Sequence, residues 1–182
     1  MSARNPLRRH IETAWQRTIA EAYSQQLINS ERGLQVHFCH RLLEEFESHQ
    51  RRVFVEPCFR AQDGSVRSPD IVVCNSQRII GVIELKYLPR MTAKYAKDLG
   101  TLNWFASARH PVEVSNDRYR GVNEIVVKRY ELASDAVLCW AGVYAGPRVD
   151  IESQALGLGS RFLCLHATTK SGRAPDIYPH SD

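Results

Sequence analysis

The stretch that decides the fold of this chain reads Pro69-Asp70-Ile71-Val72-Val73-Cys74-Asn75-Ser76-Gln77-Arg78-Ile79-Ile80-Gly81-Val82-Ile83-Glu84-Leu85-Lys86-Tyr87. Two β-branched apolar runs flank a polar tripeptide, a pattern typical of two strands joined by a tight turn. If the turn is centred near Gln77, the residue numbers of two directly paired residues sum to about 154. This register places Asp70 opposite Glu84, with Lys86 further along on the same face. A slip of one residue would move Asp70 to the other face, so the expectation depends on the register.

Three charged residues, Asp70, Glu84 and Lys86, lie at the ends of strands that are otherwise apolar. Strands so rich in Val and Ile are usually covered on both faces, where an unpaired carboxylate is costly. Two facing carboxylates repel each other unless a cation lies between them, and Mg²⁺ or, alternatively, Mn²⁺ takes such oxygen ligands. Lys86 could hold a phosphate or orient an attacking water. The residues therefore predict metal-assisted hydrolysis of a phosphodiester bond.

A family resemblance is carried by two half-motifs, Ser68-Pro69-Asp70-Ile71-Val72-Val73 and Ile80-Gly81-Val82-Ile83-Glu84-Leu85-Lys86-Tyr87. Together they resemble the signature of the PD-(D/E)XK nuclease superfamily, which has the restriction-endonuclease-like fold. The resemblance implies that Asp70, Glu84 and the backbone carbonyl of Leu85 bind the metal. It also implies that Lys86 assists the attacking water.

Members of this superfamily often add a glutamate from a helix that precedes the core strands. Glu31 is the candidate for this catalytic position, because Ser30 can cap a helix there. Glu31 would share one helix face with Leu34, Gln35 and Phe38. The alternatives lie further along the same helix and are Glu44, Glu45 and Glu47.

Apolar residues at helical spacing predict three helices. Residues 6–28 form an amphipathic pattern that we expect to pack against the core, with a dimer contact or an arm near the substrate as the alternative. A second helix is expected at 31–49. A third, capped by Thr92 and ending before Pro111, resembles the helix that follows the second half-motif in the superfamily. Lys94 and Lys97 on it are candidate nucleic-acid-binding residues, or equally solvated helix lysines.

The remaining segments predict strands and loops. A strand near 53–60 and a turn at 62–65 lead into the hairpin, which gives a three-stranded meander, and further strands are expected at 136–145 and 161–167. We expect 116–121 to be an exposed loop and 168–182 an irregular tail. The expected fold is one α/β domain over residues 1–182. It has a restriction-endonuclease-like core, in which helices flank a central mixed sheet of four to five strands, and an extra N-terminal helix.

Composition narrows the class of protein without deciding its function. The chain is 43% hydrophobic and 24% charged, values ordinary for a soluble globular protein. It has no apolar run near the length of a membrane span and no secretion-signal pattern, so we expect a cytoplasmic protein without a membrane partner. The net charge of +4 permits a polyanionic partner but does not require one. The five widely spaced cysteines are expected to be buried free thiols rather than disulfides or zinc ligands. His37 and His40 are expected to be surface or packing residues rather than a metal site.

The sequence thus predicts a Mg²⁺-dependent nuclease whose substrate is DNA rather than RNA, since the resemblance is to a mostly DNA-acting superfamily. One alternative is a catalytically silent nuclease-fold subunit that binds nucleic acid or a protein. Another is a different metal-dependent phosphoryl-transfer or RNA-processing activity on the same fold. A chain of 182 residues leaves little room for a recognition domain, so we expect a homodimer or a protein partner that gives specificity.

Overall fold

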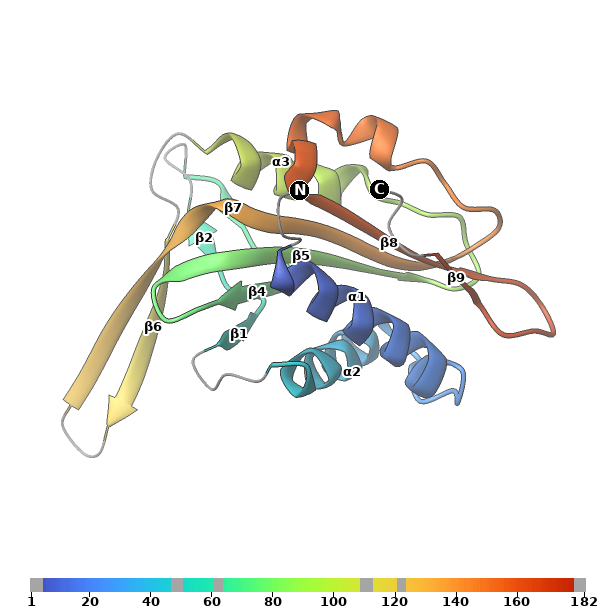
Figure 1. Cartoon of the computed structure of the whole chain (residues 1–182), viewed down its shortest axis with the longest axis horizontal. Coiled ribbons are helices and arrows are strands. Elements are labelled where there is room, and N and C mark those ends of the chain that lie inside the picture. Colours follow the sequence, from blue (N-terminus) through green and yellow to red (C-terminus); the bar gives the residue numbers. More distant parts are fainter. Residues whose placement is uncertain (1–4, 47–50, 61–63, 109–112, 121–123, 179–182) are drawn as a thin grey trace.

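The computed structural model describes residues 5–46, 51–60, 64–108, 113–120 and 124–178 (Figure 1). Helix α1, Pro6–Arg17, begins after Asn5, whose side chain accepts a hydrogen bond from the Leu7 amide. It continues as a π-helical segment, Thr18–Tyr23, and ends there, so the helix predicted over 6–28 is too long. Helix α2, Glu31–Glu44, starts at the predicted cap Ser30 and ends before the predicted 49, although residues 47–50 lie outside the described ranges.

A mixed β-sheet forms the centre of the molecule. Six strands follow one another in the order β1-β4-β5-β7-β8-β9, where β1 is Arg52–Val55, β4 is Ile71–Cys74, β5 is Arg78–Leu88, β7 is Glu124–Ala145, β8 is Phe162–Thr169 and β9 is Asp176–Tyr178. The pairs β1/β4, β4/β5 and β8/β9 are antiparallel, whereas β5/β7 and β7/β8 are parallel. The α/β class and the meander of β1, β4 and β5 are confirmed. The predicted count of four to five strands is wrong, because the sheet has six along this path.

The predicted register of the β4/β5 hairpin is confirmed. Ile71 pairs with Ile83 and Val72 with Val82, before a bulge shifts the register near the turn. The turn itself is fixed by Asn75, whose side-chain oxygen accepts hydrogen bonds from the amides of Gln77 and Arg78. Asn75 therefore helps to set the register, and the register decides on which face of the sheet each β-branched side chain lies.

Helices cover both faces of the sheet (Figure 1). Helices α1 and α2 lie on one face, where Leu7, Ile11, Trp15 and Ile19 are buried against the sheet, so the predicted core packing of the N-terminal helix is confirmed. Helix α3, Ala96–Ser107, and two short 3₁₀ helices, Glu152–Gln154 and Leu156–Arg161, cover the opposite face. Helix α3 lies in the connection between β5 and its parallel neighbour β7. The cap predicted at Thr92 is wrong, because the helix begins after Tyr95 without a side-chain cap.

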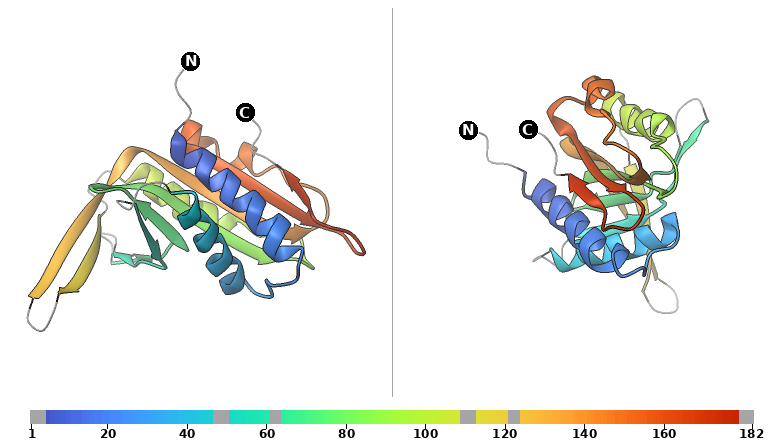
Figure 2. Two further views of the ribbon diagram at one scale, coloured as in Figure 1. Left: turned by 60° about the horizontal axis from the view of Figure 1, so that its bottom comes forward. Right: turned by 90° about the vertical axis from the view of Figure 1, so that its right-hand side faces the viewer.

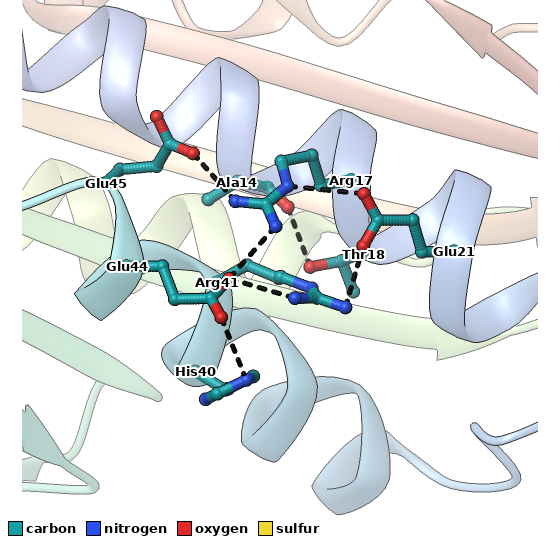
Figure 3. A network of polar contacts seen from close by, with 8 residues as sticks. All are labelled: Ala14, Arg17, Thr18, Glu21, His40, Arg41, Glu44 and Glu45. Atoms are coloured by element: carbon teal, nitrogen blue, oxygen red, sulfur yellow. Dashed lines mark hydrogen bonds and ion pairs between the residues drawn. The ribbon is translucent and has the colours of Figure 1, made fainter.

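Charged residues join the first helical segments to α2 (Figure 3). Arg17 contacts Glu21, Glu44 and Glu45 at 3.0–3.2 Å, and Arg41 contacts Glu21 at 2.7 Å and Glu44 at 2.9 Å. These contacts fix α2 against α1 and so place its N-terminal residue, Glu31, relative to the sheet.

The later part of the chain holds more strand than the sequence predicts. Residues expected as a loop at 116–121 fall largely within β6, Glu113–Arg120, which pairs with the first part of β7, while 121 lies outside the described ranges. Figure 2 shows this β6/β7 hairpin extending away from the layered body. The irregular tail expected from 168 is wrong for Thr168 and Thr169, which end β8, and for β9. The strand expected at 53–60 divides into β1 and β2, Phe59–Arg60, and β2 pairs separately with β3, Val66–Arg67.

Candidate active site

The site begins where β5 runs beyond the end of its neighbour β4. Pairing between the two strands stops at Ile83, while β5 continues to Leu88. Asp70 immediately precedes β4, and its Oδ2 accepts a hydrogen bond of 2.5 Å from the Leu85 amide. Glu31 comes from α2, and its Oε2 accepts a hydrogen bond of 3.1 Å from the Tyr87 amide. Two carboxylates thus take the place of a strand partner along this edge of β5.

The predicted pair of Asp70 and Glu84 does come together. Glu84 is 6% exposed, and its side chain shares a hydrogen bond with that of Asp70 and another with that of Thr101. Glu84 alternates along β5 with Ile83 and Leu85, which belong to the core under α1 and α2, so it points toward α3.

Lys86 lies between carboxylates from two helices. Its Nζ is 3.5 Å from Oε2 of Glu31 and 3.5 Å from Oδ1 of Asp98 on α3. Asp98 is 4% exposed, and its Oδ2 accepts a hydrogen bond of 3.1 Å from Nε1 of Trp140 on β7. The catalytic residues expected from the sequence, Asp70, Glu84, Lys86 and Glu31, are therefore brought into one cluster, and a fourth carboxylate joins them.

Asp98 is the site residue that sequence reasoning missed. It lies on the buried face of α3 at helical spacing with Thr101, Leu102 and Phe105. An acidic residue within an otherwise apolar helix face was the signal that could have found it, because such a group needs a partner. Trp140 supplies that partner, and the indole has room only because residue 142 is glycine. A Cβ atom at Gly142 would overlap the Trp140 ring.

Burial and mutual repulsion shift the pKa values of these groups. Burial, followed by the charges of Asp70 and Asp98, raises the pKa of Glu84 to about 9. Burial also raises the pKa of Asp70 and of Asp98. Burial alone would lower the pKa of Lys86, but the charges of Asp98, Glu31 and Asp70 outweigh it, and the pKa is raised. Without a further cation the cluster therefore keeps Lys86 charged and favours a proton on Glu84.

A cavity of about 240 Å³ opens beside this cluster, with walls that include Glu31, Gln35, Asp70 and Leu85. The Gln35 amide donates a hydrogen bond of 2.9 Å to the backbone carbonyl of Asp70, which holds that residue in place. Because the N–H and C=O of one strand residue leave on the same side, the Leu85 carbonyl faces the edge where Asp70 binds its amide. At roughly 30 Å³ for each water, the cavity has room for a hydrated divalent cation. Carboxylates and a carbonyl are the oxygen ligands that Mg²⁺ and Mn²⁺ take.

Among the competing helix glutamates that the structure describes, Glu31 is the one that reaches the cluster. Glu44 and Glu45 point toward Arg17 in the network between α1 and α2 (Figure 3). Glu47 lies outside the described ranges. Lys97 is exposed in the first turn of α3, whereas Lys94 is exposed before the helix, so its predicted place on the helix is wrong. Their contact with nucleic acid stays a prediction.

A second group of potential ligands lies on the α3 side of the sheet. Glu152, Cys164 and His166 place their ligand atoms within 4.8 Å of one another, the one such group of three among the described residues. Nε2 of His166 is 3.0 Å from Sγ of Cys164, and Nδ1 is 2.8 Å from the Tyr144 hydroxyl. Sulfur and imidazole suit Zn²⁺ rather than Mg²⁺. This group is not predicted from the sequence, because no close-spaced metal-ligand motif marks it. The expected burial of the cysteines is wrong for Cys58, which is exposed, and Cys39 is only partly buried.

Comparisons with known proteins give no match. No family model matches the chain, and neither a curated protein nor a solved structure matches it. Within the described parts of the chain, no helix has both the length and the apolar character to cross a membrane.

Proposed function

We propose that the chain is a metal-dependent nuclease of the PD-(D/E)XK type, with a restriction-endonuclease-like fold, that hydrolyses phosphodiester bonds of DNA. The observation that carries the proposal is the open edge of β5, where Asp70 and Glu31 bind the amides of Leu85 and Tyr87 beside Lys86. The antiparallel β1/β4/β5 meander, followed by α3 and the parallel strand β7, agrees with the element order of that fold.

The residues present fit a divalent cation. Four carboxylates, those of Glu31, Asp70, Glu84 and Asp98, surround Lys86. The other cation in the cavity wall, Arg32, pairs with Glu56 at 3.0 Å, so acidic groups outnumber basic ones. Asp70 and the Leu85 carbonyl would hold Mg²⁺ or Mn²⁺ at the cavity, with Glu84 and Glu31 next to them. A bound cation of this kind lowers the pKa of water and stabilises negative charge on the leaving oxygen.

The remaining residues position Lys86. Its ammonium group stays charged, and the contacts with Glu31 and Asp98 hold it beside the cavity. From there it orients a water or binds a nonbridging phosphate oxygen. Asp98 acts through Lys86, and Trp140 fixes Asp98, so both are positioning residues.

Cleavage assays with matched variants test the proposal. Plasmid, linear and single-stranded DNA and RNA are incubated with the wild type in Mg²⁺, in Mn²⁺ and in EDTA. We expect cleavage in either metal, none in EDTA, and loss of cleavage in Asp70→Asn and Lys86→Gln. Glu44→Gln is the control, because it removes a carboxylate that belongs to the α1/α2 network instead.

Metal binding is measured separately from cleavage. Increasing Mg²⁺ should stabilise the wild type, by roughly 2.7 kcal/mol at a hundred times the Kd, as measured by thermal melting. The melting temperature of Asp70→Asn should not change with Mg²⁺. A wild type that binds Mg²⁺ and nucleic acid but cuts no substrate would be a silent nuclease-fold subunit. A wild type that neither cuts nor responds to the metal would contradict the proposed site.

A further inference from the structure

A groove of about 940 Å³ lies at the end of the sheet next to the candidate active site. Its walls come from the residues that follow β5, the end of β7, the turn between β8 and β9, and the segment after the first helix. The right-hand view of Figure 2 looks onto this end of the molecule. Because β5, β7 and β8 are parallel, this is where the carboxyl ends of three strands meet, the usual place for ligands in such sheets.

The groove is positively charged. Arg90, Lys170 and Arg173 line it, and none of the described residues in its walls is acidic. Asp176 contacts Lys170 at 3.2 Å and Arg173 at 2.9 Å, yet both cations keep about half of their side chains exposed, at 48% and 54%. One carboxylate thus orders two cations without neutralising the groove.

Two tyrosines supply aromatic surface in the same walls. The rings of Tyr23 and Tyr87 pack edge to face with their centres 6.2 Å apart. The Tyr87 hydroxyl donates a hydrogen bond of 2.9 Å to the Ile28 carbonyl, which fixes the ring. The backbone amide of the same Tyr87 binds Glu31, so the groove begins where the carboxylate cluster ends.

We infer that this groove binds a single-stranded segment of nucleic acid that leads away from the cleaved phosphate, an inference that rests on the proposed nuclease function. Basic side chains that follow the backbone, combined with aromatic rings on which bases stack, are the features of single-strand binding. Base pairing hides the faces of the bases, so the tyrosines favour an unpaired strand over a duplex. The groove therefore selects substrates with a free single-stranded end or a frayed segment.

The test compares two charge-neutralising double variants in EDTA, so that binding is measured without cleavage. Lys170→Gln/Arg173→Gln alters the groove. Arg60→Gln/Arg78→Gln removes the same charge elsewhere, and Arg78 begins β5, roughly 30 Å along the strand from Leu88. Fluorescence anisotropy with labelled single-stranded and duplex oligonucleotides of one sequence, at several salt concentrations, gives affinities and salt slopes.

We expect the groove variant to weaken single-strand binding about tenfold or more at ~0.1 M salt and to reduce the salt slope by about 1.4, while the control variant changes neither. Tyr23→Leu should weaken single-strand binding roughly 5- to 150-fold with its salt slope unchanged, since it removes stacking and no charge. Melting curves check that every variant is folded.

Two results overturn the inference. One is a groove variant that binds single strands as the control variant does, and the other is a loss of duplex binding with single-strand binding intact. If the wild type cuts nothing yet the groove variant loses single-strand binding, the groove assignment stands and the nuclease proposal fails. If the wild type cuts and the groove variant binds normally, the groove assignment alone fails.

Discussion

Two groups of charged side chains in this molecule differ in how far their charges are paired. Between α1 and α2, Arg17 and Arg41 pair with the carboxylates around them, and hydrogen bonds from Arg41 lower the pKa of Glu44 (Figure 3). At the open edge of β5, one lysine faces four carboxylates, and burial raises the pKa of Glu84. The first group needs nothing more to be stable, whereas the second gains from a cation. This difference distinguishes the network that holds α1 and α2 together from the candidate active site.

Neutralising Glu84 in the second group should give the largest effect. We expect Glu84→Gln to reduce the cleavage rate roughly a thousandfold, because several kcal/mol of metal-dependent stabilisation are lost. The metal-free variant should nevertheless melt at a higher temperature than the wild type, since the folded protein no longer has to keep a buried carboxyl group protonated. Initial rates and melting curves measure the two effects. A variant that cuts at the wild-type rate would remove Glu84 from the site.

The pH dependence of stability gives the next largest effect. The pKa of Glu84 is about 9 in the fold and 4.5 ordinarily, so between these values the folded protein holds a proton that the unfolded chain has released. The free energy of unfolding of the metal-free protein should therefore fall as the pH rises from about 4.5 to about 9, by up to about 1.4 kcal/mol per pH unit. Urea unfolding in EDTA at several pH values measures the slope. Glu84→Gln should flatten it, and an equally steep slope would assign the proton to another group.

Displacing Trp140 should have a moderate effect on both stability and activity. In Gly142→Ala the new methyl group overlaps the indole, which we expect to cost about 1–3 kcal/mol and to move Asp98 away from Lys86. Gly100→Ala is the matched control, because its Cβ would meet no atom within 4 Å and alanine favours a helix. Chemical unfolding and cleavage rates should show loss in the first variant only. Equal behaviour of the two would mean that the indole does not position Asp98.

Breaking an ion pair between α1 and α2 should have the smallest effect. Exposed pairs contribute little to stability, so we expect Glu44→Gln to lower the melting temperature by at most about 4 °C and to leave cleavage unchanged. A clear loss of cleavage would show that this group controls the position of Glu31.

The hairpin and its charged residues could be predicted because their signals are local. β-branched runs and Asn75 determine the register, and the register alone brings Asp70 to Glu84. The resemblance pointed to Glu31, whose helix is capped by the next residue upstream.

Other features depend on contacts between distant residues. Asp98 stands at an apolar position of its helix, but the partner that places it in the site, Trp140, lies 42 positions later in the chain. The segment that forms β6 is polar and carries no strand pattern, and its pairing with β7 stabilises it. Glu152 meets Cys164 and His166 only because a short 3₁₀ helix folds over β8.

The open edge of β5 also bears on how copies of the chain behave toward one another. A strand edge with free amide groups is a template on which a strand of another molecule can add, which is how many proteins begin to aggregate. Asp70 and Glu31 occupy the amides of Leu85 and Tyr87, so the carboxylates of the candidate active site also close this template. Asp70→Ala would reopen it and favour precipitation at high concentration, whereas an asparagine at the same position keeps an acceptor for the Leu85 amide. The acids of the candidate active site thus also cap a strand edge on which another copy of the chain could pair.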